Sequence, residues 1–154
     1  MKKILAAIIA MIMVFAFIGC AKKEPRFYEA NAVADALNLG LEFGEELEKS
    51  SAEVALAIYG IDQSLCSNAA IYNGSGATAD EIAVFNCVDD AAAETVYQAA
   101  EARLQYLYEG YSSYGPDEVP KIEASSVIRE GNTVILCVCN NFDAVQKIAD
   151  SAAE

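Results

Sequence analysis

The sequence predicts an α+β domain in which four strands form a mainly antiparallel sheet with helices on one face. Short apolar segments occur in two pairs, each with glycine between its members, which is typical of hairpins. Before, between and after these pairs, apolar residues recur at helical spacing. The expected order of elements is α-α-β-β-α-β-β-α. A length of 154 residues allows one ordinary domain of this kind.

Two helices are expected before the first strand. Apolar residues recur every four positions over about 31–39, which predicts the first helix. Ser50 and Glu53 have the spacing of a capping box and predict the start of a second helix. That helix is expected to end at Gly60, because glycine readily adopts the left-handed cap conformation. Glycines interrupt the pattern over 41–48, so that segment is left unassigned.

The first pair of strands is expected at 69–72 and 81–88, with a glycine-rich loop at 73–76. Thr78 and Glu81 also have capping-box spacing, which leaves a helix as the alternative for the second segment. A strand is preferred because the apolar run is short and rich in β-branched and aromatic residues.

A long helix is expected to follow, from Asp89 and Asp90 to about Gly110. Two acids at the start of a helix cap it and suit its dipole. Its apolar side chains fall on one face. The segment 112–120 holds two of the three prolines and is expected to be a loop.

The second pair of strands is expected at 125–129 and 133–139. Gly131 and Asn132 lie between the two segments and predict a tight hairpin turn. An amphipathic pattern over 142–153 predicts a last helix.

The N-terminus has the pattern of a bacterial lipoprotein signal. Two lysines precede an apolar run over 4–18, too short for a bilayer span, which needs about twenty residues. The run ends in Gly19-Cys20, which resembles the lipobox, where cleavage before the cysteine is followed by lipidation of its thiol. An uncleaved anchor and an ordinary signal peptide are the alternatives. Three cations follow the predicted lipid site and favour anionic headgroups: Lys22, Lys23 and Arg26.

These patterns divide the chain into a signal peptide (1–19), a lipidated tether (20–28) and one α+β domain (29–154). Removal of 1–19 takes away two of ten basic residues and none of 23 acidic ones, so the mature charge is −15. The expected location is the outer face of the cell membrane, with the membrane as a partner through the lipid.

Composition argues against several functions. A formal charge of −13 does not suit nucleic-acid binding, which needs a basic face. The chain has no histidine, so it offers no Ser-His or Cys-His couple and no histidine-ligated metal. We therefore expect a non-enzymatic binding or accessory module without a cofactor or metal, whose partner is an unidentified envelope protein or small ligand.

Four cysteines remain beside the lipid site, and they permit three disulfide pairings: Cys66, Cys87, Cys137 and Cys139. Three of the four lie in apolar strand patterns, which favours buried free thiols over a single disulfide. Cys137 and Cys139 are two apart on one strand and point to one face. This pair is the basis of the alternative function, a thiol redox or metal-handling lipoprotein.

Two other patterns are candidate sites. Residues 74–79 fit the G-x-G-x-x-A outline of a dinucleotide loop, but a strand rather than a helix is expected next, which favours a plain glycine turn. Tyr106, Tyr108 and Tyr114 gather at the end of the long helix and are the candidate binding surface, since tyrosines suit recognition. The preferred alternative is that Tyr111 and Tyr114 pack in the core while Tyr108 lies on the opposite side of the helix.

Several segments stand out together with the lipobox: Leu56–Asp62, Ala77–Ile82, Arg103, Tyr114–Pro116 and Gly131-Asn132. In these landmarks the chain resembles the domain of unknown function 4358, a family of small bacterial lipoproteins. The resemblance covers about Val33 to Ile148. It implies an envelope location and one α+β domain. It implies no activity and supplies no catalytic or binding residues.

Overall fold

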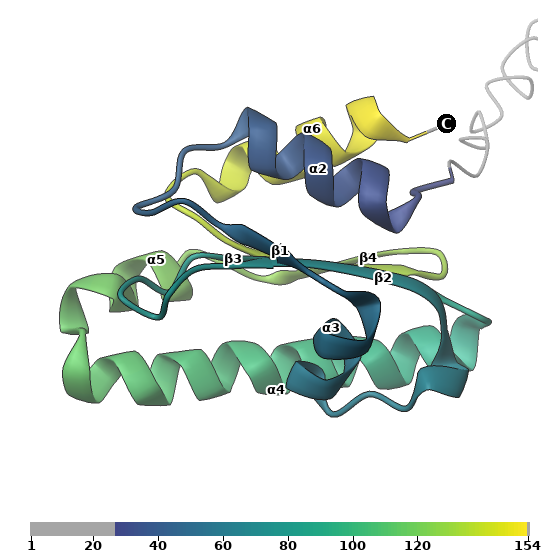
Figure 1. The fold of residues 1–154 in the computed structure, drawn as a ribbon, viewed down its shortest axis with the longest axis horizontal. Coiled ribbons are helices and arrows are strands. Elements are labelled where there is room, and N and C mark those ends of the chain that lie inside the picture. The colour runs from purple at the N-terminus through teal and green to yellow at the C-terminus, as the bar shows by residue number, and fades with distance from the viewer. Residues whose placement is uncertain (1–26, 154) are drawn as a thin grey trace, which may run out of the picture.

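The computed structural model describes residues 27–153, which form one antiparallel sheet between two layers of helices (Figure 1). Within these residues the sheet has five strands in the order β1-β2-β3-β5-β4. The strands are β1 (Glu48–Ser50), β2 (Cys66–Asn73), β3 (Glu81–Cys87), β4 (Val127–Glu130) and β5 (Thr133–Val138). The helices are α2 (Ala30–Gly40), α3 (Ala52–Tyr59), α4 (Asp90–Tyr114), α5 (Val119–Glu123) and α6 (Val145–Ala152). Short 3-10 turns occupy Gln63–Leu65, Pro116–Glu118 and Phe142–Ala144.

Helices cover both faces of the sheet, so the expectation of helices on one face is wrong. Figure 1 shows α2 and α6 on one side of the strands and α3 and α4 on the other. The reason is that β3 and β5 are buried at every position. A strand with no exposed side chain needs cover on both faces, as its continuous apolar run indicates.

The sheet also has one strand more than expected in the described part of the chain, so the four-strand order is wrong. The additional strand, β1, pairs with β2 at the sheet edge. It is three residues of Glu-Lys-Ser, too short and too polar to show the alternation that identifies a strand. It falls directly before α3, whose cap is Ser51 rather than Ser50: the Ser51 side chain accepts a hydrogen bond from the amide of Val54.

The segment 112–120 is largely helical rather than a loop. Helix α4 continues to Tyr114, and the turn at Pro116–Glu118 leads directly into α5. Both prolines stand in the first turns of these short helices. Proline is tolerated there because the first amides of a helix have no intrahelical acceptor.

The remaining predicted elements are confirmed, with small shifts of their ends. The segment 81–88 is a strand and not a helix, and α3 ends at Gly60 in the left-handed region (φ 63°). The hairpin of β4 and β5 turns at Gly131 (φ 58°). No helix within residues 27–153 is both long enough and apolar enough to span a membrane.

Strand β3 is the central strand of the sheet, and its side chains alternate between the two helical layers. Ala83 and Phe85 face α3 and α4, whereas Ile82 and Val84 face α2 and α6. Two buried carboxylates stand at the start of this alternation, Asp80 just before the strand and Glu81 as its first residue. Their side chains therefore point toward opposite faces of the sheet.

The other end of β3 fixes the first helix to the sheet through Asn86. Its amide nitrogen donates to the carbonyl oxygen of Tyr28 at 2.6 Å and to the hydroxyl of Thr133 at 3.1 Å. Its amide oxygen accepts from the backbone N–H of Ala30 at 2.8 Å. The sequence pattern places Tyr28 in the tether, yet its side chain is buried with α2. The predicted signal peptide and the lipid site Cys20 lie outside the described residues.

Candidate functional site

A buried carboxylate organises the face of the sheet that α3 and α4 cover. Glu81 is 3% exposed and accepts hydrogen bonds from the Tyr59 hydroxyl (2.6 Å) and from Arg103 Nε (3.1 Å) and Nη2 (2.6 Å). The last two form a two-pronged contact that fixes the plane of the guanidinium. Burial of a carboxylate costs several kcal/mol unless it is paired, so Glu81 holds Arg103 in one place.

Arg103 in turn reaches the surface. Its side chain is 21% exposed, and its guanidinium lies beside the rings of Tyr106 (5.4 Å) and Tyr59 (6.0 Å). Burial lowers the pKa of Arg103, but the hydrogen bond and the charge of Glu81 outweigh it and raise the pKa. Burial and the neighbouring Glu81 charge raise the pKa of Tyr59 well above its usual value. Arg103 is therefore a fixed cation, and Tyr59 a neutral hydrogen-bond donor.

A groove of about 510 Å³ lies between α3 and α4 above this pair. Tyr59 and Arg103 line it together with the alanines Ala99 and Ala102 of α4. The complete lining is Ala57, Ile58, Tyr59, Gly60, Ala99, Ala102, Arg103 and Tyr106. Tyr106 is 66% exposed, which places a large aromatic ring at the rim. The groove thus offers aromatic walls and one positioned cation, a combination typical of recognition sites.

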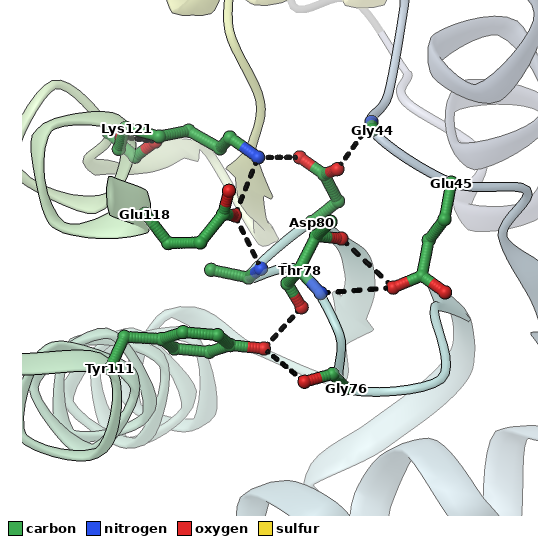
Figure 2. A network of polar contacts seen from close by, with 10 residues as sticks. Gly44, Glu45, Gly76, Thr78, Asp80, Tyr111, Glu118 and Lys121 are labelled. Carbon is green, nitrogen blue, oxygen red and sulfur yellow. Dashed lines mark hydrogen bonds and ion pairs between the residues drawn. The ribbon is translucent and has the colours of Figure 1, made fainter. Parts of the chain in front are cut away.

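The second buried carboxylate, Asp80, belongs to the polar network that Figure 2 shows around the loop between β2 and β3. It accepts from Lys121 Nζ on α5 (2.8 Å) and from the amide of Gly44 (2.6 Å). Lys121 also donates to Glu118, which accepts from the amide of Ala79. Burial lowers the pKa of Lys121, but these two carboxylates outweigh it and raise the pKa. These contacts fix the segment that leads into Glu81.

The glycine loop at 74–79 binds a carboxylate of the chain itself. Glu45 accepts from the amide and hydroxyl of Ser75 (3.0 and 2.6 Å) and from the amide and hydroxyl of Thr78 (3.2 and 3.0 Å). These bonds, those of Ser75 foremost, lower the pKa of Glu45 to about 2. The Tyr111 hydroxyl donates to the carbonyl oxygens of Gly76 and Thr78 (Figure 2). The loop joins two antiparallel strands, which confirms the glycine turn rather than a dinucleotide loop.

The three tyrosines of the predicted binding surface do not lie together. Tyr106 lines the α3–α4 groove, whereas Tyr108 lines a smaller hollow of about 200 Å³ beside α5. Tyr114 is exposed and its ring lies 4.7 Å from that of Tyr111. Tyr111 is buried, as the alternative interpretation expected, but Tyr114 is not. Of the three, Tyr106 is the one that the structure places beside Arg103.

Cys137 and Cys139 lie under α2 and α6, on the opposite face of the sheet from the groove. Both side chains are buried, at 0% and 1% exposure, and their thiols share a hydrogen bond. That bond and burial raise the pKa of Cys137. The four cysteines of the described part are free thiols, and no group of three or more His, Cys, Asp or Glu side chains there is placed to hold a metal ion.

Sequence reasoning did not select Glu81, Arg103 and Tyr59 as a site. One signal was available: Glu81 is an acid at the start of a strand whose other positions are apolar or amide side chains. A carboxylate so placed must have a buried partner. The identity of that partner depends on how α4 crosses the sheet, which the spacing of residues does not reveal.

Comparison with known families identifies one match, to the family described as a domain of unknown function (DUF4358), over residues 41–139. The chain belongs to this family. The match is shorter than the sequence resemblance suggested. It includes the sheet, α3, α4 and α5, and leaves out α2 and α6. Comparison with curated proteins and with solved structures found no match.

Proposed function

We propose that this protein is a lipid-anchored binding module on the outer face of the cell membrane and that it is not an enzyme. The α3–α4 groove is its binding site. The observation that carries the proposal is the Glu81–Arg103 pair, which holds a partly exposed guanidinium beside two tyrosine rings in the lining of a groove. The absence of histidine supports a binding role over a catalytic one.

The chemistry of the groove indicates what it binds. Tyrosine rings and alanine methyl groups favour an apolar or aromatic group, and the guanidinium favours a hydrogen-bond acceptor at one end. The partner is therefore an envelope protein or small ligand that presents an apolar group beside a carboxylate or carbonyl oxygen.

The position of the groove supports an anchored arrangement. The described chain begins at Phe27 and enters α2, which lies on the face of the sheet opposite to α3 and α4 (Figure 1). The described chain therefore begins on the side of the sheet away from the groove, which suits an anchor upstream of Phe27 and a partner that contacts Arg103 and Tyr106.

Anchoring is tested by Cys20→Ala in the full-length chain. Cells fed with labelled palmitate are expected to label the wild-type protein and not the variant, and the variant should remain an uncleaved precursor. Ser67→Ala serves as the control for expression and export. Palmitate label on Cys20→Ala would contradict the anchoring proposal.

The groove is tested by site-specific photocrosslinking in intact cells. A photoreactive residue is introduced at Tyr106 in one strain and at Tyr108 in another, since both side chains are exposed on α4 and only Tyr106 lines the groove. The expected result is a discrete adduct from position 106 that position 108 does not give. The same adducts from both positions, or none from 106, would contradict the groove as the binding site.

A further inference from the structure

A second pair of cysteines lies on the groove side of the sheet. Cys66 begins β2 and Cys87 ends β3, and the two residues face each other directly in the antiparallel register. A bulge at Ser67 separates this pairing from the regular register that starts at Asn68. Both side chains contact the cluster under α3 and α4, where Cys87 is buried and Cys66 is half-buried.

The backbone hydrogen bonds define which kind of cross-strand pair this is. The amide of Cys87 points away from β2 and donates to Asn132 on the other side (2.8 Å). The next amide, of Val88, donates across to the carbonyl oxygen of Leu65 (3.0 Å). Cys66 and Cys87 are therefore a non-hydrogen-bonded pair, whose Cα atoms lie about 4.5 Å apart in antiparallel sheets. That separation is within the range of about 4.4–6.8 Å that a disulfide spans.

We propose that Cys66 and Cys87 form a redox-active dithiol, which closes to a cross-strand disulfide by exchange with an external organic disulfide. The Cys66 thiolate attacks the external disulfide, forms a mixed disulfide and releases one thiolate. The Cys87 sulfur then attacks the Cys66 sulfur and displaces the second. Two protein thiols are oxidised, one external disulfide is reduced to two thiols, and the two protons pass to the released thiolates.

The two cysteines differ in exposure and in pKa, as the two steps of the exchange reaction require. Cys66 is the half-buried member that an external disulfide can reach, whereas Cys87 is covered. A hydrogen bond from the Cys87 thiol lowers the pKa of Cys66, and the same bond together with burial raises the pKa of Cys87. Cys66 is thus the attacking thiol and Cys87 the resolving thiol.

The other pair, Cys137 and Cys139, has similarly opposed pKa shifts but lacks both the cross-strand geometry and an exposed member. Cys137 lies on β5 opposite Ile82, and Cys139 lies just beyond the end of β5, so the two are not directly opposed on neighbouring strands. Neither side chain is exposed to an external disulfide. Exchange is therefore expected at one pair and not at the other.

The chain is suited to a direct test, because trypsin separates the two pairs. No lysine or arginine lies between Lys49 and Arg103, so Cys66 and Cys87 share the peptide 50–103. Cys137 and Cys139 share the peptide 130–147. The full-length chain in detergent is incubated with oxidised glutathione, its remaining thiols are blocked, and the peptides are weighed. The expected result is a loss of two hydrogens in 50–103 and blocked thiols in 130–147. Cleavage after Glu81 should then leave two fragments joined only by the disulfide.

Matched variants separate the attacking from the resolving role. Cys87→Ser should retain a glutathione adduct on Cys66, whereas Cys66→Ser should gain none on Cys87. Cys137→Ser should leave the oxidation of 50–103 unchanged. The proposal is overturned if 130–147 is oxidised as readily as 50–103. It is also overturned if the peptide 50–103 of the folded chain keeps both thiols at a concentration of oxidised glutathione that oxidises the same peptide in the unfolded chain.

Discussion

Arg103 and Arg129 are two arginines in ion pairs of very different burial. Arg103 meets Glu81, which is 3% exposed, whereas Arg129 meets Asp90 and Glu94 at the surface. Arg103→Ala leaves a buried carboxylate without its cation, which costs about 3–5 kcal/mol of unfolding free energy. Arg129→Ala breaks exposed pairs that contribute about 0–1 kcal/mol. Urea denaturation of both variants measures the difference, and equal losses would contradict a structural role for the buried pair.

The lowered pKa of Glu45 predicts how the stability of the fold depends on pH. Its pKa is about 2 in the folded chain against an ordinary value of 4.5, because the loop residues Ser75 and Thr78 bind the carboxylate. Its contribution to stability is therefore complete above about pH 4.5 and is lost as the pH falls through about 2. Glu45→Gln should be less stable than wild type at neutral pH, and the gap should close over that window. Denaturation midpoints across pH check this.

The control for that experiment is Glu46→Gln, one position along at an exposed site. The denaturation midpoint of Glu46→Gln should change with pH as the wild-type midpoint does between pH 4.5 and 2. A gap between wild type and Glu45→Gln that does not change with pH would contradict the role of the loop as a carboxylate binder.

Single residues show where sequence reasoning reached its limit at the site. The sequence predicts a recognition surface at the tyrosines of α4, and Tyr106 does line the groove. Tyr108 lies on another side of α4, because residues 106 and 108 are about 200° apart around a helix. Arg103 and Tyr59 were not selected, since their meeting at Glu81 depends on three elements that pack against each other.

At the scale of elements, Asn86 holds α2 against the sheet. Replacing it with Ala leaves the carbonyl of Tyr28 and the amide of Ala30 without the partner that the side chain supplies. Loss of a buried hydrogen-bond partner costs about 1–3 kcal/mol. Amide exchange in α2 should therefore quicken in Asn86→Ala, while amides of α4 keep their protection. Equal quickening in both helices, or none in α2, would contradict this attachment.

Sequence patterns predicted most elements but not their layers. The periodicity of α4 and the apolar runs of β3 and β5 are strong local signals, and they are confirmed. Strand β1 has no such signal, because pairing with β2 rather than its own side chains makes it a strand. The second helical layer was missed although β3 and β5 lack polar alternation, which indicates burial on both faces.

At the scale of the whole molecule, the two helical layers come from different parts of the chain. Helices α3 and α4, which form the groove, lie within the family match, whereas α2 and α6 flank it. The flanking pair covers the face where Cys137 and Cys139 are buried. The face of the sheet under α2 and α6 therefore lies next to the start of the described chain. The opposite face, under α3 and α4, carries the groove and the Cys66–Cys87 pair.

The central claim is that the α3–α4 groove binds a partner, and the affinity of the adduct-forming partner for two variants tests it most directly. Calorimetry on the full-length chain in detergent compares Tyr106→Ala with Tyr108→Ala. An aromatic anchor in a groove contributes more than about 1 kcal/mol, so Tyr106→Ala should weaken binding by about tenfold. Tyr108→Ala should bind within about twofold of wild type. Equal affinities for the two variants would contradict the account.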